Sequence, residues 1–143
     1  MISTLLTAWC LLALTVTIHA AGLSALLRGL PLALRDKRFL TVTWQLLRVA
    51  WRLILLHLAE IAVWALFYWW QKCLPDAESS VYFSGVTYTT VGYGDLVLPK
   101  EWRLLGPLEG LTGILMCGLS TGFFFAAVSR FLGAKPTSEQ LLP

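Results

Sequence analysis

The sequence predicts an all-α membrane protein with three transmembrane helices and one short re-entrant helix. Of its 143 residues, 57% are hydrophobic and only 13% are charged, whereas a typical soluble domain is about half apolar and a quarter charged. The apolar residues also gather into three long runs, and about 20 such residues suffice to cross the hydrocarbon core of a bilayer. A chain of this length is expected to form one domain, without a separate soluble catalytic domain.

The first predicted element is an N-terminal transmembrane helix over residues 1–28. Residues 2–27 contain no Lys, Arg, Asp or Glu. A signal peptide is the competing interpretation, but it normally carries a positive charge before its apolar region, and the first basic residue here is Arg28. His19 stands alone within this helix, and we expect it to make a helix contact rather than to bind a ligand.

A cytoplasmic basic linker is predicted next, over residues 29–46. Between residues 28 and 52 the chain has six basic residues and one acid. Basic loops favour the cytoplasmic side, so the N-terminus is predicted outside and the C-terminus inside. The linker side chains that could also contact anionic lipid headgroups are Arg35, Lys37 and Arg38. Nucleic acid is not expected as a partner.

Two further spans flank a segment that is too short to cross a bilayer. The outer helix is expected at residues 47–71 and the inner helix at residues 104–132, followed by a short cytoplasmic tail at 133–143. Between the two spans, residues 77–89 follow Pro75 and are rich in Ser and Thr. Their length and composition predict a re-entrant helix rather than a further transmembrane helix.

The three cysteines show no metal-ligand spacing. Cys10 and Cys117 lie within apolar runs, and they are expected to pack as small hydrophobic side chains. Cys73 follows the second span on the predicted outer face, where a free thiol and a disulfide between subunits are both open.

Residues 90–95 read Thr-Val-Gly-Tyr-Gly-Asp. A pore that strips water from potassium must replace it with oxygens, and rings of backbone carbonyls can supply them. Glycine allows backbone angles that other residues resist, so successive carbonyls can face one axis. Irregular backbone is tolerated at membrane depth only where protein encloses it. The segment therefore predicts an ion-conducting filter made of Thr90, Val91, Gly92, Tyr93 and Gly94.

The filter segment resembles the signature of potassium channels, and the preceding Tyr-Phe-Ser-x-x-Thr-x-Thr resembles their pore helix. Over residues 47–132 the chain is similar to the pore domain of small prokaryotic-type potassium channels of the two-transmembrane family, with an extra N-terminal transmembrane helix. The resemblance implies a homotetramer with four-fold symmetry around one pore. It also implies that potassium ions bind at Thr90, Val91, Gly92 and Tyr93.

The same resemblance implies residues that support the filter. Tyr82 and Phe83 would form an aromatic cuff around Tyr93, and the remaining support would come from Asp95 at the mouth and from Thr87 and Thr89 near the cavity. The sequence departs from some relatives at Val86, where they carry a Glu that bonds to the Asp after the filter. Inactivation that depends on such a pair is therefore in doubt for this chain.

Glu60 lies within the second span, where an ionisable group usually has a function, and His57 lies one turn earlier. We favour a buried carboxyl bonded to a hydroxyl such as Ser84 or Thr87 over a proton sensor, and Glu109 is expected to anchor the surroundings of the filter. Three glycines of the inner helix could serve close packing, the commoner role, or a hinge: Gly113, Gly118 and Gly122.

Taken together, these features predict an integral multi-pass protein of the cell membrane that passes potassium passively in a lipid bilayer. A weakly selective cation channel and a non-conducting scaffold or modulatory subunit are the alternatives. No nucleophile and base arrangement indicates an enzyme, and the regularly spaced intramembrane Arg residues of a voltage sensor are missing. The gating stimulus, rectification, the conducting state and the role of the extra helix stay open.

Overall fold

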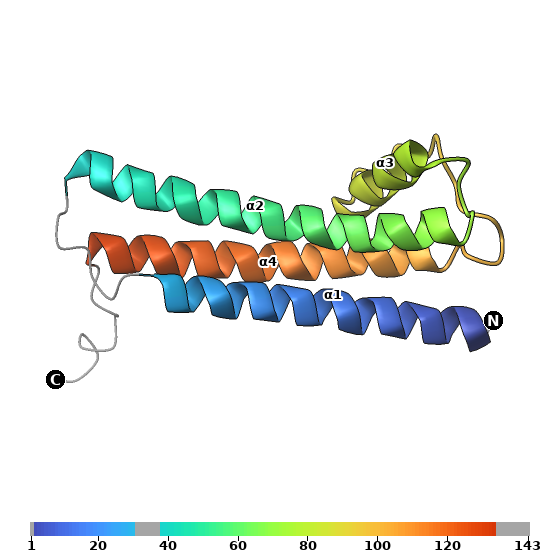
Figure 1. The fold of residues 1–143 in the computed structure, drawn as a ribbon, viewed down its shortest axis with the longest axis horizontal. Coiled ribbons are helices and arrows are strands. Elements are labelled where there is room, and N and C mark those ends of the chain that lie inside the picture. The colour runs from blue at the N-terminus through green and yellow to red at the C-terminus, as the bar shows by residue number, and fades with distance from the viewer. Residues whose placement is uncertain (1, 31–37, 134–143) are drawn as a thin grey trace, which may run out of the picture.

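The structure is a computed structural model that describes residues 2–30 and 38–133. Its helices, in chain order, are α1 (Ile2–Gly29), α2 (Phe39–Trp70), α3 (Ala77–Tyr88) and α4 (Leu105–Leu132), as Figure 1 shows. The described part of the chain contains no strand. The predicted all-α class, with a short helix between the second and third long helices, is therefore confirmed.

The three long helices lie side by side, and α3 lies at the end of the bundle that also holds the N-terminus (Figure 1). Both α1 and α3 contact α2 and α4. The extra N-terminal helix therefore packs directly on the two helices that also hold α3.

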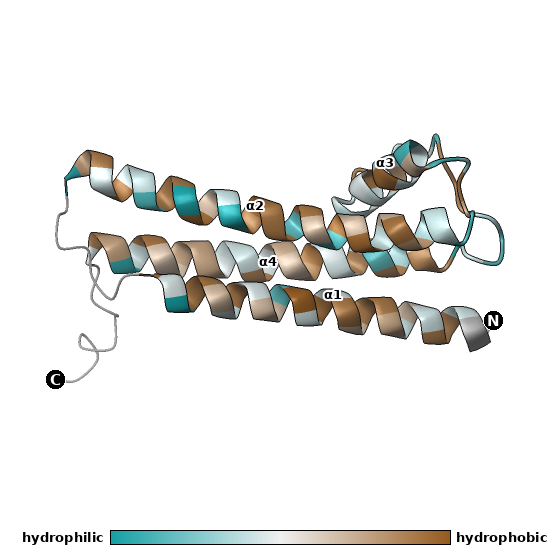
Figure 2. Cartoon of the chain, in the orientation of Figure 1, coloured by the Kyte–Doolittle hydropathy of each residue, from teal (hydrophilic) through white to brown (hydrophobic). Residues whose placement is uncertain are grey.

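Three helices are long and apolar enough to cross a membrane, over Thr4–Gly29, Phe39–Trp70 and Leu105–Leu132. Brown, apolar residues cover much of their length in Figure 2. The 32 residues of α2 correspond to about 48 Å at a rise of 1.5 Å per residue, which exceeds the roughly 30 Å of a hydrocarbon core. The helix α2 is therefore longer than the hydrocarbon core is thick.

The outer helix begins at Phe39, and the prediction of a start at residue 47 with a linker up to residue 46 was wrong. Four residues explain the longer helix, because their spacing puts them on one helical face. This face packs into a cluster with Leu26, Ala127 and Phe131. The residues that form it are Val42, Leu46, Val49 and Leu53. Tertiary burial of this face accounts for the helix over residues 39–46 of the predicted linker.

A second apolar cluster holds together the opposite end of the bundle, where α3 lies. It includes Trp64, Tyr68, Phe83 and Leu105, so it joins α2, α3 and α4. Cys73 is a free thiol within this cluster and is only 6% exposed. Burial raises the pKa of the Cys73 thiol, and the carboxylate of Glu101 raises it further.

The other two cysteines occupy different surroundings from those expected. Cys10 and Cys117 are exposed on the surface of the chain, so they do not pack inside the helix bundle of one chain.

Candidate functional site

The predicted filter follows directly from the end of α3. The backbone N–H of Thr90 donates to the carbonyl of Thr87 at 2.9 Å, and that of Gly92 donates to the carbonyl of Val86 at 3.0 Å. The last turn of α3 therefore continues into a tightly folded segment. Residues 91–93 have no regular secondary structure.

Positive φ angles alternate along this segment. Thr90, Gly92 and Gly94 have φ angles of 62°, 52° and 78°, whereas Val91 and Tyr93 between them do not. Alternating backbone of this kind allows successive carbonyls to face the same side, an arrangement that suits a row of oxygen ligands. A Cβ added at Gly92 or Gly94 would meet nothing within 4 Å in the chain, so backbone conformation rather than space requires glycine there.

The segment is uncovered in a single chain. Val91 and Tyr93 are 52% and 71% exposed, and every residue from 89 to 95 is classed as exposed. The segment therefore lies at the surface of one chain, with its side chains and backbone accessible.

Two of the predicted supporting residues make contacts at α3. The hydroxyl of Tyr82 donates to Asp95 Oδ2 at 2.8 Å, which ties α3 to the residue after the filter and raises the pKa of Tyr82. Phe83 is buried, and its ring lies edge-on to Tyr68 with centroids 5.3 Å apart. The cuff around Tyr93 stays a prediction.

The threonines predicted near the cavity contribute to the end of α3. The hydroxyl of Thr89 donates to the carbonyl of Gly85 at 2.7 Å. The carbonyl of Thr87 accepts the bond from Thr90 described above. Both residues therefore help to end the helix at the start of the filter segment.

Glu109 is fully buried and links three helices. Tyr68 of α2 donates its hydroxyl to Glu109 Oε2 at 2.7 Å, and Ser84 of α3 donates to Oε1 at 2.5 Å. Ser84 also lies 2.9 Å from the carbonyl of Ile61. These bonds fasten α3 to its neighbours, and the role of Glu109 as an anchor of the filter's surroundings stays a prediction.

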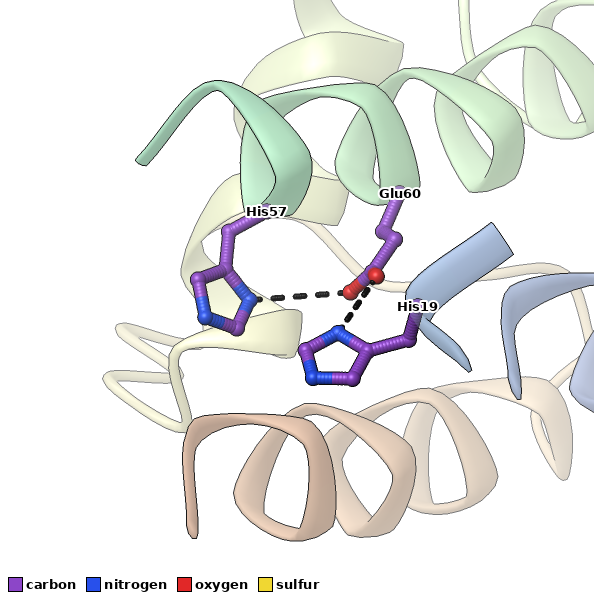
Figure 3. A group of neighbouring side chains, drawn as sticks. All are labelled: His19, His57 and Glu60. Atoms are coloured by element: carbon purple, nitrogen blue, oxygen red, sulfur yellow. Dashed lines mark hydrogen bonds and ion pairs between the residues drawn. The ribbon is translucent and has the colours of Figure 1, made fainter. Parts of the chain in front are cut away.

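Glu60, also fully buried, lies at the centre of a second polar cluster (Figure 3). His19 Nδ1 of α1 lies 2.8 Å from Glu60 Oε1, and His57 Nδ1 lies 3.6 Å from Oε2. The hydroxyl of Tyr88, at the end of α3, donates to Glu60 Oε2. His57 Nδ1 also lies 3.0 Å from the Tyr88 hydroxyl.

Glu60 bonds to a hydroxyl of α3, as expected, but not to that of Ser84 or Thr87. Ser84 bonds to Glu109 instead, and Tyr88, one helical turn later on the same face of α3, reaches Glu60. His19 makes the helix contact expected of it, but its pairing with Glu60 was missed. The available signal was a buried acid in one span and a histidine in another, since intramembrane ionisable residues usually pair.

The three glycines of α4 differ in their surroundings. A Cβ added at Gly113 would lie 1.9 Å from the carbonyl oxygen of Tyr88, so Gly113 permits α4 to touch the end of α3. A Cβ at Gly118 or Gly122 would meet nothing within 4 Å. Close packing is therefore the role of Gly113 in this chain.

The predicted lipid-contact residues are described only in part. Arg38 is exposed and occupies the N-cap position of α2. Arg35 and Lys37 lie outside the described residues, as do residues 134–143 of the predicted tail.

Comparison with known protein families matches residues 40–130 to the family described as "Ion channel". The match covers α2, α3, the filter segment and nearly all of α4, and it leaves out α1. Comparisons with curated proteins and with solved structures gave no significant match.

Proposed function

The chain belongs to the ion channel family, and from this premise we propose that it is a potassium-selective channel that conducts through residues 90–94. The observation that carries the proposal is the alternation of positive φ angles at Thr90, Gly92 and Gly94. Backbone with positive φ at three alternate positions allows the carbonyls of the segment to face one side. Carbonyl rings of this kind replace the hydration shell of potassium.

The proposal includes a homotetramer, which the exposure of this segment supports. Irregular backbone at membrane depth must be enclosed by protein or line a wet path, yet residues 89–95 are exposed in one chain. Four copies around an axis would cover the filter from the sides and leave one ion path along it. The apolar residues exposed on α4 would then contact neighbouring copies or lipid, and they include Leu111, Ile114, Leu115 and Leu119.

The electrostatics around the filter favour a cation. The C-terminal end of α3, where the dipole is negative, lies next to Thr90. Asp95 is exposed directly after the filter and would concentrate cations at its mouth. We further propose that the basic residues near the N-terminal end of α2 face the cytoplasm, with the N-terminus of the chain outside and anionic lipid contacting Arg38.

The proposal is tested by reconstituting the purified protein in liposomes and measuring potassium and sodium flux. We expect potassium uptake that barium blocks, with little sodium uptake under the same conditions. Comparable permeation of both ions would favour the weakly selective cation channel instead. Absence of flux at every pH, voltage and lipid composition tried would favour the non-conducting alternative.

A pair of glycine variants sharpens the assay. Gly94→Ala adds a Cβ where φ is 78°, a strained angle for residues other than glycine, and we expect it to abolish selective flux. Gly85→Ala is the matched control, because Gly85 lies within α3, has no positive φ and has open space around its Cβ position. Equal flux from both variants would contradict the assignment of the filter.

A further inference from the structure

We propose that His19, His57 and Glu60 form a binding site for a transition-metal ion of the zinc class, one site per chain. The site lies apart from the filter and between α1 and α2, beside the end of α3 (Figure 3). Imidazole nitrogens select zinc, copper and nickel, whereas potassium takes oxygen ligands. The inference therefore concerns a second cation and a second site.

The donor atoms of the three residues already converge. One nitrogen from each histidine and a carboxylate oxygen of Glu60 lie within 4.8 Å of one another, and both imidazoles are directed at the carboxylate in Figure 3. Ligands held about 2.1 Å from one tetrahedral ion lie about 3.4 Å apart. The separations of 2.8 and 3.6 Å between the imidazoles and the carboxylate bracket this value.

The groups around the ligands fit a metal site as well. His19 Nε2, on the side of the ring away from Glu60, lies 3.5 Å from Ser120 Oγ of α4. Metal-bound histidines commonly donate their second ring N–H to an oxygen, which fixes the orientation of the ring. The Tyr88 hydroxyl lies 3.0 Å from His57 Nδ1, so it is the nearest candidate for a fourth position.

An ion can reach the site from one side. A cavity of about 320 Å³ lies between α2 and α4, and its lining includes His57, Cys117 and Ser120. His57 is the most accessible of the three ligands, at 19% side-chain exposure, whereas His19 and Glu60 are buried. An ion that enters beside His57 therefore meets His19 and Glu60, which the helices hold in position.

The net charge of the three ligands suits a divalent ion. Glu60 supplies one negative charge and the two neutral imidazoles supply none, so the carboxylate offsets part of the charge of the metal. A divalent ion bound at Nδ1 of a neutral imidazole requires the ring hydrogen to be on Nε2, so binding would fix the tautomer of both histidines. Because Glu60 also accepts a bond from Tyr88, metal binding would change the hydrogen bonding at the end of α3.

The direct test is metal binding to the purified full-length protein, which does not depend on conduction. After treatment with a chelator, we expect isothermal titration with Zn²⁺ to show one site per chain. We expect the Co²⁺-loaded protein to show the absorption of a tetrahedral centre, and pulsed magnetic resonance of the Cu²⁺-loaded protein to detect two imidazole nitrogens. These spectra need no variant, so they test the ligands even if a variant fails to fold.

Variants then assign the ligands. His19→Gln and Glu60→Gln should each weaken Zn²⁺ binding at least tenfold, and Ser120→Ala should weaken it about tenfold through loss of ring orientation. Glu109→Gln is the matched control, since Glu109 is an equally buried carboxyl whose partners are hydroxyls. It should leave the affinity unchanged.

Three results would overturn the proposal. The first is the absence of Zn²⁺ and Co²⁺ binding to wild-type protein. The second is binding that His19→Gln and Glu60→Gln leave intact, because the ion would then sit elsewhere, for example on the exposed thiol of Cys117. The third is a cluster that binds no metal but changes the pH dependence of flux when Glu60 is neutralised, which would make it a proton site.

Discussion

Among the described residues, two carboxyl groups are fully buried, and their surroundings differ. Glu109 of α4 binds the hydroxyls of Tyr68 and Ser84, whereas Glu60 of α2 lies among two imidazoles and one phenol. Both reach α3, at residues one turn apart. Hydroxyl partners can only satisfy a carboxyl, but imidazoles can also bind a metal or exchange protons.

Glu109 therefore makes structural contacts, whereas the surroundings of Glu60 suit metal binding or proton exchange. The family match covers both carboxyl groups, but it does not include α1, which supplies His19. The extra helix therefore adds the one ligand that turns a buried acid and its neighbouring histidine into a three-residue cluster. This contribution is the clearest role that the structure suggests for α1.

The largest expected effect concerns the anchor. Glu109→Ala removes the acceptor of the buried Tyr68 hydroxyl and leaves a cavity between three helices. We expect a loss of about 3 kcal/mol in the free energy of unfolding, from the unpaired hydroxyl and the lost packing. Unfolding of the reconstituted protein, followed by tryptophan fluorescence, measures it. A loss under about 1 kcal/mol would contradict the role of Glu109 as an anchor.

The second largest effect on stability is expected for a glycine of α4 that packs against the end of α3. In Gly113→Ala the new Cβ would meet the Tyr88 carbonyl at 1.9 Å, so α3 and α4 must separate. Overpacking of this kind costs about 2 kcal/mol, and the movement should also disturb Tyr88 and weaken Zn²⁺ binding. Gly118→Ala is the control, since nothing lies within 4 Å of its Cβ position. Equal stability of the two variants would show that the close contact is unimportant.

Glu60→Gln should have a smaller effect on the free energy of unfolding than on Zn²⁺ binding. Glutamine keeps an oxygen that can accept the Tyr88 bond, so we expect a loss of about 1 kcal/mol. The same fluorescence experiment, run beside the Zn²⁺ titration, separates the two effects. If Glu60→Gln destabilised the protein more than Glu109→Ala while leaving Zn²⁺ binding intact, the roles assigned to the two carboxyls would be reversed.

The fold was largely predictable because it depends on local signals. Hydropathy located all three spans, and Pro75 with its polar neighbours located the start of α3. The start of α2 was missed because Arg48 and the preceding polar residues obscure the spacing of Val42, Leu46 and Val49. Their burial against α1 and α4 is a tertiary effect, and tertiary packing can override local pattern.

The site was predictable only in part, for a related reason. The filter is contiguous in sequence, so its residues could be named together. The contact between His19 and Glu60 joins residues 41 positions apart, and it depends on the rotation of α1 about its axis. Which turn of α3 faces Glu60 depends on the tilt of α3, so the sequence could not distinguish Ser84 from Tyr88.

The smallest expected effect concerns how accessible the surroundings of Glu109 and of Glu60 are. The reaction rates of the nearby cysteines measure it. Cys73 is buried beside Tyr68, the partner of Glu109. Cys117, in contrast, is exposed and lines the cavity next to His57. Single-cysteine variants should therefore react with a small maleimide more slowly at Cys73 than at Cys117. Mass spectrometry measures both rates.

The pH dependence of the Cys73 reaction tests the same difference. Burial raises the pKa of this thiol, and only the thiolate reacts, so less of it is reactive at neutral pH than for an ordinary thiol. Its rate should keep rising with pH beyond the point where a free thiol in solution has reached its plateau. Reaction at Cys73 as fast as that of the free thiol would mean that the buried cluster around Tyr68 opens to solvent.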